Sequence, residues 1–359
     1  MPRWTNFGEA KRRKIERRTK YCFHRRVVDL KKRVRQAFNI IFPFVLGGLI
    51  LYWMYREFDF GKFNREFVET TNWWWMAFSL VFGVTAQVFR GLRWRQTLEP
   101  MGEYPRRSTC IYSIFISYAS SLIIPRIGEV ARCAVLKRYE GTNFTKAVGT
   151  VVTERIIDTL LMLLMVALTI ILQLKVFRTF FDETGTSIEG IFNRFTPMGW
   201  LVALLCAVIA VWFVCYLVKK MALLAKFRKV VSDMKEGVLS LRGVRNKWLF
   251  IFYTLMIWVS YFVHFYLTFY CFGFMDGLGL MCALVAFTVG SISVIVPTPN
   301  GAGPWHFSVK TILCLYGVGM DDAVMFVLVV HSIQTALVPL LGVWALIALS
   351  FTKKTKQGD

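Results

Sequence analysis

The stretch Ser120–Gly141, "SSLIIPRIGEVARCAVLKRYEG", separates two apolar parts of the chain and governs the architecture that we predict. Pro125 stands where an apolar helix would be expected to finish crossing a membrane, and four charged or conformationally free residues follow it: Arg126, Gly128, Glu129 and Arg132. Proline removes a helical hydrogen bond and glycine permits tight turns, so we expect the helix to end here. We interpret the charged residues as the returning limb of a re-entrant hairpin.

The composition excludes an ordinary soluble protein. The chain has 359 residues, of which 56% are apolar and 16% aromatic, well above the usual share for a soluble domain. Runs near the ~20 residues that cross a hydrocarbon core occur at Phe38–Tyr55, Trp73–Gly91, Trp200–Val218, Trp248–Phe272 and Ala323–Phe351. A sixth span begins at either Ala147 or Ile156. We predict an all-α polytopic integral membrane protein.

The distribution of Lys and Arg predicts the topology, because cytoplasmic loops accumulate these residues. Residues 1–37 carry 14 basic and 3 acidic side chains, without the apolar core of a signal peptide, and residues 219–247 carry 9 and 2. Segments 91–108 and 126–146 also have a basic excess, whereas 56–72 and 176–198 do not. Both termini are therefore expected in the cytoplasm. The net charge of +22 is explained by this topology better than by nucleic-acid binding.

These assignments agree only if two apolar segments, 109–125 and 280–296, enter and leave the membrane on the same side. The second segment ends in another proline- and glycine-rich break, "VIVPTPNGAGPW" at 294–305. We therefore predict about six full spans plus two re-entrant helical hairpins in an inverted repeat, an arrangement typical of secondary transporters. Repeat one covers about 73–175 and repeat two about 248–351.

The predicted domain organisation is simple. A basic cytoplasmic segment (1–37) precedes the transmembrane domain (38–351), and a short cytoplasmic tail (352–359) follows it. Within the domain, residues 219–247 alternate apolar and basic side chains at helical spacing, which indicates an interfacial amphipathic helix or a surface that docks a partner. The eight cysteines are scattered without CxxC pairs and are interpreted as buried apolar residues rather than disulfides or metal ligands.

Charged residues near the first break are candidate binding residues. Arg126, Glu129 and Arg132 recur every three residues and would share a helix face. Arginine forks match phosphate oxygens, although the same residues could be solvated charges at the membrane interface. Downstream, Thr150, Glu154 and Asp158 form a polar stripe with Arg155 beside it. Acidic groups at membrane depth are costly and usually functional, so we expect one to pair with an arginine of the hairpin.

Four residues of the second break are further candidates: Asn300, Gly301, Gly303 and His306. The glycines permit close backbone approach. The Asn300 and His306 side chains could hydrogen-bond a headgroup, and His306 could carry a proton or serve only as a packing or capping residue.

Three motifs occur in one order: P-R-x-G-E-x-x-R from Pro125, E-R-x-x-D from Glu154, and P-x-P-x-G-x-G from Pro297. With these motifs in this order, the chain resembles the flippase-like family that contains the transmembrane region of lysylphosphatidylglycerol synthases. The resemblance covers about residues 38–350. The resemblance implies an inverted-repeat fold that moves phospholipids between leaflets of the bacterial cytoplasmic (inner) membrane. The family often has a second glycine at the position of Asn300 and an acidic residue at that of His306.

We therefore expect a lipid translocase for a phospholipid with an anionic or aminoacylated headgroup. No catalytic residue, metal or cofactor is predicted, and the aminoacyl-transferase domain of the synthases is not found, so only the membrane function is expected to carry over. Two alternatives stay open: a membrane-embedded transferase that uses Glu154 or Asp158, and an accessory subunit of a lipid-modifying system. A homodimer also remains open.

Overall fold

The computed structural model describes residues 41–42, 44–56, 61, 69–173, 243–296 and 298–352. Several predicted features lie outside these residues: the basic segment 1–37, the span Trp200–Val218, most of the amphipathic segment 219–247, Pro297, and nearly all of the tail. All regular secondary structure in the described ranges is helical, which confirms the all-α prediction for them.

Eight helices carry the described fold: α3 (Trp73–Leu98), α4 (Arg107–Ile123), α5 (Gly128–Glu140), α6 (Phe144–Leu172), α11 (Lys247–Tyr266), α12 (Leu280–Ser293), α13 (Pro304–Leu315) and α14 (Met320–Ser350). Short 3-10 segments accompany them: η2 (Glu99–Met101), η4 (Leu267–Cys271), η5 (Gly273–Met275) and η6 (Pro299–Gly301). A further apolar helix, Phe44–Tyr55, precedes α3.

Four of the described helical stretches are long and apolar enough to cross a membrane: Trp73–Met101, Phe144–Leu172, Lys247–Cys271 and Met320–Ser350. Their length and composition support a multi-pass membrane protein. The helix Phe44–Tyr55 is shorter than such a span, and Trp200–Val218 is not described. The total of about six spans therefore stays a prediction.

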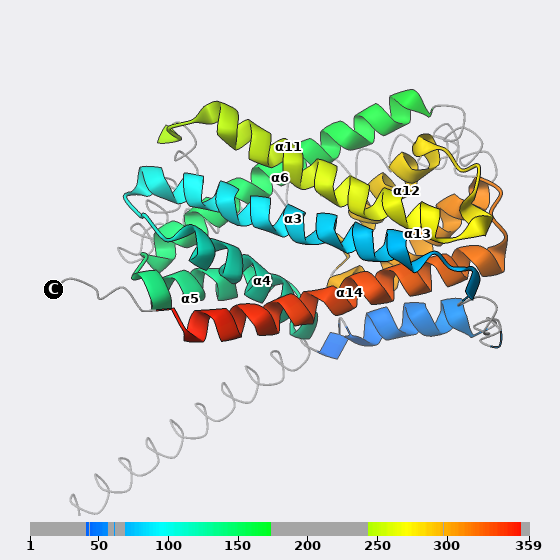
Figure 1. Ribbon diagram of the computed structural model, residues 1–359, viewed down its shortest axis with the longest axis horizontal. Helices are drawn as coiled ribbons and strands as arrows, with labels where there is room; N and C mark the ends of the chain where they lie inside the picture. The colour runs from blue at the N-terminus through cyan, green and yellow to red at the C-terminus, as the bar shows by residue number, and fades with distance from the viewer. Residues whose placement is uncertain are drawn as a thin grey trace, which may run out of the picture.

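The order of the helices repeats. A long helix, two short helices and a second long helix occur as α3–α6 and again as α11–α14. The first helices of the two sets, α3 and α11, pack side by side and run in opposite directions (Figure 1). This is the order that the predicted inverted repeat requires.

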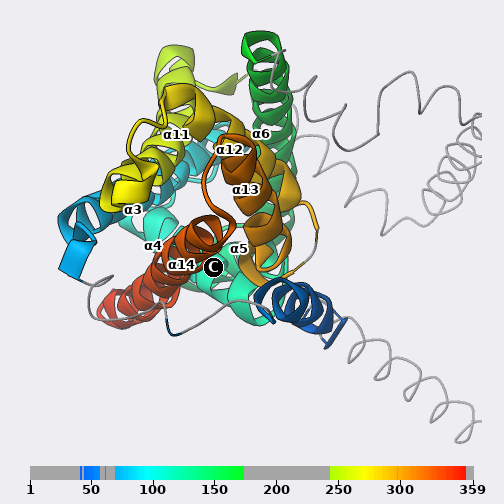
Figure 2. The same ribbon diagram turned by 90° about the vertical axis from the view of Figure 1, so that its right-hand side faces the viewer.

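The two sets of helices are packed into each other. Helix α4 of the first set packs on α14 of the second, and α12 of the second packs on α6 of the first. Figure 2 shows α12 and α13 between α6 and α14. At the α4–α14 crossing the backbones come so close that a Cβ added at Gly342 would overlap the Cβ of Ala119. The two repeats therefore form one packed body and not two domains.

The first break is a four-residue turn between α4 and α5. Helix α4 ends at Ile123, and α5 begins at Gly128 against the body of α4. A Cβ at Gly128 would overlap the carbonyl oxygen of Ser117, so only glycine fits this contact. Arg126 lies in the turn with φ of 66°. The expectation that it shares a helix face with Glu129 and Arg132 is therefore wrong.

The second break contains three residues with positive φ, and the middle one is Gly301 with φ of 75°. Asn300 has φ of 51° and Gly303 has φ of 93°, and α13 begins directly afterwards at Pro304. Gly303 thus needs the conformational freedom that only glycine has. Asparagine is one of the few other residues that tolerates the left-handed region, which explains how Asn300 can occupy this position.

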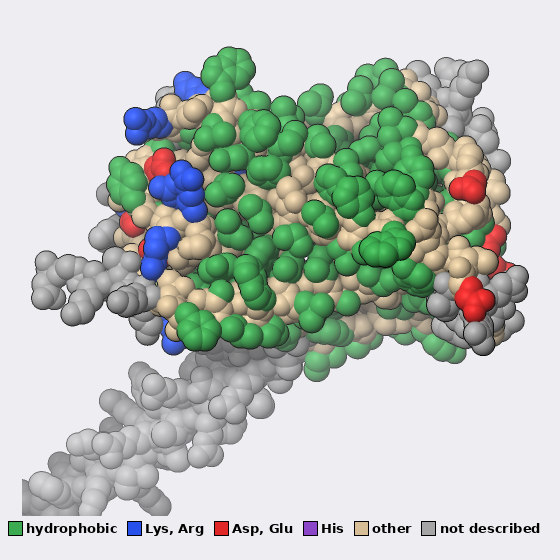
Figure 3. Space-filling model, viewed as in Figure 1, with side chains coloured by type: hydrophobic (Ala, Val, Ile, Leu, Met, Phe, Trp, Pro, Cys, Tyr) green, Lys and Arg blue, Asp and Glu red, His purple; other side chains and the backbone are tan. Residues whose placement is uncertain are grey.

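The surface separates charge by end. Figure 3 shows an apolar middle, Lys and Arg gathered at the end where α3 finishes, and acidic side chains at the opposite end. Exposed residues at the first end, which we call the basic end, include Arg107, Lys137 and Arg138. At the other end, Asp276 is exposed in a link and Asp321 in the first turn of α14. This distribution agrees with the loop charges read from the sequence.

Candidate functional site: a buried charge cluster beside a cavity

The centre of the site is Asp158, on the inner face of α6. Its Oδ2 accepts a hydrogen bond from Nη1 of Arg90 at 2.8 Å, and its Oδ1 accepts one from Nη2 of Arg93 at 2.8 Å. Both arginines come from α3. Each carboxylate oxygen therefore has its own guanidinium donor, the strong charge-assisted kind of hydrogen bond.

One helical turn away, Glu154 joins the same network. Its Oε2 accepts from Nη1 of Arg132 at 2.7 Å, and its Oε1 lies 3.4 Å from Nε of Arg93. Arg93 thus bridges both acids of α6, and the side chains of Arg93 and Glu154 are 0% exposed. Such a group of charges is stable at depth only because each charge has an opposite partner.

Aromatic and hydroxyl groups hold the Arg132 side chain in place. Its guanidinium lies 4.5 Å from the centre of the Trp94 ring, a cation–π contact. The Trp94 indole in turn donates to Oγ1 of Thr150 at 2.9 Å. The predicted polar stripe of Thr150, Glu154 and Asp158 therefore faces inward as a unit, and all three residues are buried.

A second, more exposed ion pair lies at the edge of this cluster. Nε of Arg155 is 3.4 Å from Oε1 of Glu129, with side chains 45% and 44% exposed. Nη2 of Arg155 also lies 3.5 Å from Oδ2 of Asp158. The predicted residues of the first hairpin and of α6 are thus joined by ion pairs, except Arg126.

The sequence reasoning missed Arg90 and Arg93. The basic excess of segment 91–108 predicts that Arg93 lies in a loop, but α3 continues to Leu98 and buries it. The expected pairing of an α6 acid with a hairpin arginine is confirmed for Glu154 and Arg132, whereas Asp158 is paired with α3 and not with the hairpin's Arg132. A signal was present in the sequence: Gln87, Arg90, Trp94 and Thr97 recur at three- and four-residue spacing, which places them on one face of a helix. Arg93, beside Trp94, is buried with them.

The cluster has unused donor capacity. Nε of Arg90, Nη1 of Arg93 and Nη2 of Arg132 are buried and have no hydrogen-bond partner in the described structure. Buried polar groups are nearly always hydrogen-bonded, so the N–H groups of Arg90 and Arg132, which line the cavity described next, could donate to an acceptor that enters it. Nε of Arg93 and Oε1 of Glu154 also lack a hydrogen bond, but they lie 3.4 Å apart as an ion pair, and each acid accepts at least one hydrogen bond from an arginine.

A cavity of about 220 Å³ lies against this cluster and joins the two breaks. From the first repeat, its lining includes Arg90, Arg126, Glu129, Arg132 and Arg155. From the second, it includes Val294, Val296, Thr298, Asn300 and Gly301. Nη2 of Arg126 reaches across and donates to the carbonyl oxygen of Ile295 at 3.1 Å. Arg126 thus lies in the turn before α5, and its side chain connects the two breaks.

The second break is held by its own polar network. Nδ2 of Asn300 donates to Oγ1 of Thr335 at 2.6 Å. The backbone carbonyl oxygen of Asn300 lies 3.1 Å from Nε2 of His331. The backbone N–H of Gly303 donates to Nδ1 of His306 at 3.3 Å. Neither Gly303 nor His306 lines the cavity. Among the described residues, His306 caps the start of α13, and its ring centre lies 4.3 Å from that of His331 with the two rings tilted by 57°.

The charge balance of the site is positive. Five arginines line the cavity or belong to the cluster, Arg90, Arg93, Arg126, Arg132 and Arg155, against the three carboxylates Glu129, Glu154 and Asp158, which leaves an excess of two positive charges. In the ranges that the structure describes, no group of three or more His, Cys, Asp or Glu side chains is arranged to hold a metal ion. This excess of positive charge would attract an anionic group.

Comparison with known families identifies the chain. The model of the lysylphosphatidylglycerol synthase transmembrane-region family matches residues 40–342, and the chain belongs to this family. The family is a membrane domain associated with lipid modification and flippase-type function. Comparisons with curated proteins and with solved structures gave no match.

Proposed function

We propose that this member of the lysylphosphatidylglycerol synthase transmembrane-region family moves a phospholipid between the two leaflets of a membrane and leaves it chemically unchanged. The observation that carries the proposal is the cavity of about 220 Å³ lined by both helix breaks. Two of its lining residues, Arg90 and Arg132, each have a buried guanidinium N–H group without a partner among the described residues. A phosphate diester would supply both the acceptor oxygens and the negative charge that these groups require.

In this proposal the buried ion pairs and the half-exposed ion pair of the site have different roles. The buried pairs of Glu154 and Asp158 with α3 and α5 fix the arginines in position. The half-exposed pair Glu129–Arg155 opens toward the cavity, so Glu129 is free to meet an amine and Arg155 a phosphate. A headgroup that carries both, zwitterionic or aminoacylated, is therefore preferred, with its acyl chains remaining in the lipid.

The breaks supply the means of movement. We propose that the pairs α4–α5 and α12–α13 are re-entrant hairpins from opposite faces, which meet at the cavity and open it alternately to each side. The protein is proposed to reside in the bacterial cytoplasmic membrane with both termini in the cytoplasm, following the charge asymmetry of its loops. A homodimer is compatible with this arrangement.

The test is leaflet exchange by the purified full chain in liposomes. A headgroup-labelled phosphatidylethanolamine and a labelled aminoacylated phosphatidylglycerol are placed in one leaflet, and their exchange is compared with that in empty liposomes. We expect faster exchange of both, with lipid recovered unaltered by mass spectrometry. A labelled diacylglycerol, which lacks the phosphate, crosses bilayers by itself and should exchange at the same rate with and without protein.

A transferase would give a different pattern. Exchange at the empty-liposome rate for every lipid tested, together with a new lipid product that forms only when the protein is present, would refute translocation and favour the enzymatic alternative. Exchange that is unaffected and lipid that is unaltered would favour an accessory role.

A further inference from the structure

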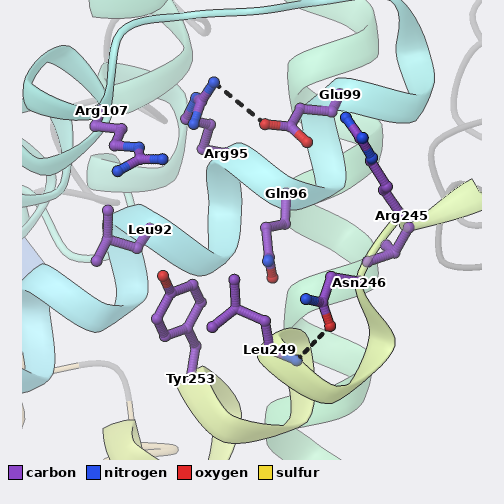
Figure 4. Close-up of a pocket in the computed structure, with 10 residues that line it drawn as sticks. Leu92, Arg95, Gln96, Glu99, Arg107, Arg245, Asn246, Leu249 and Tyr253 are labelled. Carbon is purple, nitrogen blue, oxygen red and sulfur yellow. Dashed lines mark hydrogen bonds and ion pairs between the residues drawn. The ribbon is translucent and has the colours of Figure 1, made fainter.

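A second cavity, of about 430 Å³, lies at the basic end and is separate from the charge cluster. Its walls come from the last turns of α3, from η2, from the first residue of α4 and from the start of α11. The polar residues that line it are Arg95, Gln96, Glu99, Arg107, Arg245, Asn246 and Tyr253. Figure 4 shows Gln96 in the middle, with Arg107 on one side and Arg245 on the other.

The arginines of this cavity differ in whether they already form ion pairs or hydrogen bonds. Arg95 is held by Oε1 of Glu99 at 3.3 Å and donates from Nε to the carbonyl oxygen of Pro105 at 3.0 Å. Arg107 and Arg245 are exposed and, within the described part of the chain, form no ion pair. Three arginines against one glutamate leave two uncompensated positive charges around the cavity.

The cavity also has an unused acceptor and an apolar wall. Oε1 of Gln96 is buried and has no hydrogen-bond partner among the described residues. The Asn246 side chain is already engaged, because its Oδ1 accepts from the N–H of Leu249 at 3.0 Å as the cap of α11. Leu92, Val244 and Leu249 complete the lining. The occupant should therefore offer an anion to the arginines and a hydrogen-bond donor to Gln96.

We infer that this cavity binds a phosphate-bearing ligand that carries a hydroxyl or ammonium group beside its phosphate. Arg107 and Arg245 would approach the phosphate from opposite sides of Gln96 (Figure 4), and Gln96 would accept the hydrogen bond of the neighbouring group. Two sources share this chemistry: the headgroup of a lipid in the adjacent leaflet, and a soluble phosphate ester. The inference does not depend on the proposed translocation, since no residue of this cavity lines the cavity between the breaks.

The experiment measures ligand-induced stabilisation of the full chain in detergent, because a ligand that binds the folded state raises the melting temperature by mass action. The soluble probe is glycerol phosphate, with glycerol as its control at matched ionic strength. The lipid probe is lysophosphatidic acid, with a monoacylglycerol of the same chain as its control. We expect saturable stabilisation by at least one phosphate-bearing probe and by neither control.

Variants assign the effect to the cavity. Arg107→Gln/Arg245→Gln should weaken apparent affinity about tenfold or more. The matched control Lys137→Gln/Arg138→Gln removes two exposed charges at the same end, outside the cavity, and should leave affinity unchanged. Gln96→Leu should weaken binding of glycerol phosphate or lysophosphatidic acid but not of inorganic phosphate.

The outcomes separate the two sources and can overturn the inference. Stabilisation by lysophosphatidic acid alone identifies a lipid headgroup, whereas stabilisation by glycerol phosphate identifies a soluble ester. Absence of saturable stabilisation by either probe, or full affinity in the Arg107/Arg245 variant, would show that the cavity binds no such ligand. An equal loss of apparent affinity in the Lys137→Gln/Arg138→Gln control would also overturn the inference, because it would show a general effect of surface charge. Because leaflet exchange is not the readout, failure here leaves the proposed function untouched.

Discussion

Arg132 of α5 and Glu154 of α6 form an ion pair of 2.7 Å, and their side chains are 2% and 0% exposed. The pair joins the returning limb of the first break to the following long helix. It lies against the Trp94 ring of α3, so three helices meet at one guanidinium. Buried pairs of this kind are retained at a cost of desolvation, and here they fix the arginines beside the cavity.

Removal of one member of this pair should be far more harmful than removal of both. Arg132→Met leaves Glu154 with only the 3.4 Å approach of Arg93, and we expect a loss of about 3–5 kcal/mol in the free energy of unfolding. The double variant Arg132→Met/Glu154→Leu should recover part of that loss. Denaturant unfolding in detergent, arranged as a double-mutant cycle, measures the coupling. Additive effects of the two substitutions would mean that the pair is not coupled.

The exposed pair should affect transport and not stability. Glu129 and Arg155 are 44% and 45% exposed, and pairs of this kind contribute about 0–1 kcal/mol. We expect Glu129→Gln and Arg155→Gln each to slow leaflet exchange of a zwitterionic phospholipid severalfold, with the melting temperature nearly unchanged. The control is Arg106→Gln, which breaks the 2.8 Å pair with Glu140 at the basic end and should leave exchange normal. Normal exchange in both site variants would remove this pair from the proposed mechanism.

Gly128 should be irreplaceable at the first break. An added Cβ overlaps the Ser117 carbonyl oxygen, and over-packing against a fixed backbone typically costs about 1–3 kcal/mol or more. Gly128→Ala should therefore lower the melting temperature clearly. Gly48 lies in the helix Phe44–Tyr55, and a Cβ added there would meet no atom within 4 Å, so Gly48→Ala should be neutral or stabilising by up to about 1 kcal/mol. Equal effects at the two glycines would contradict the close packing of α5 on α4.

The two ends of the molecule should face opposite sides of the membrane. In a cysteine-free background, Asp321→Cys at the acidic end should react with an impermeant thiol reagent added outside intact cells. Arg138→Cys at the basic end should react only after the membrane is opened, because basic segments are retained in the cytoplasm. External labelling at position 138 would mean that the segment 109–125 crosses the membrane fully, and the re-entrant arrangement would be lost.

The local features of this protein follow from short stretches of its sequence. Apolar runs predicted the long helices, because a helix in lipid must satisfy its own backbone hydrogen bonds. Pro125 with Gly128 marked the first break, and the four-residue spacing of Glu154 and Asp158 placed both acids on one face of α6. Each of these features depends on residues close together in the chain.

The groups that these residues meet are set by tertiary packing. The partners of Asp158 are Arg90 and Arg93, 68 and 65 residues earlier in the chain, and Arg126 reaches Ile295 in the opposite break. Helical periodicity fixes the direction in which a side chain points, but not which distant helix packs against that face. The choice of partner depends on the packing of α3 and α5 on α6 and on the close approach of the two breaks, which no local pattern contains.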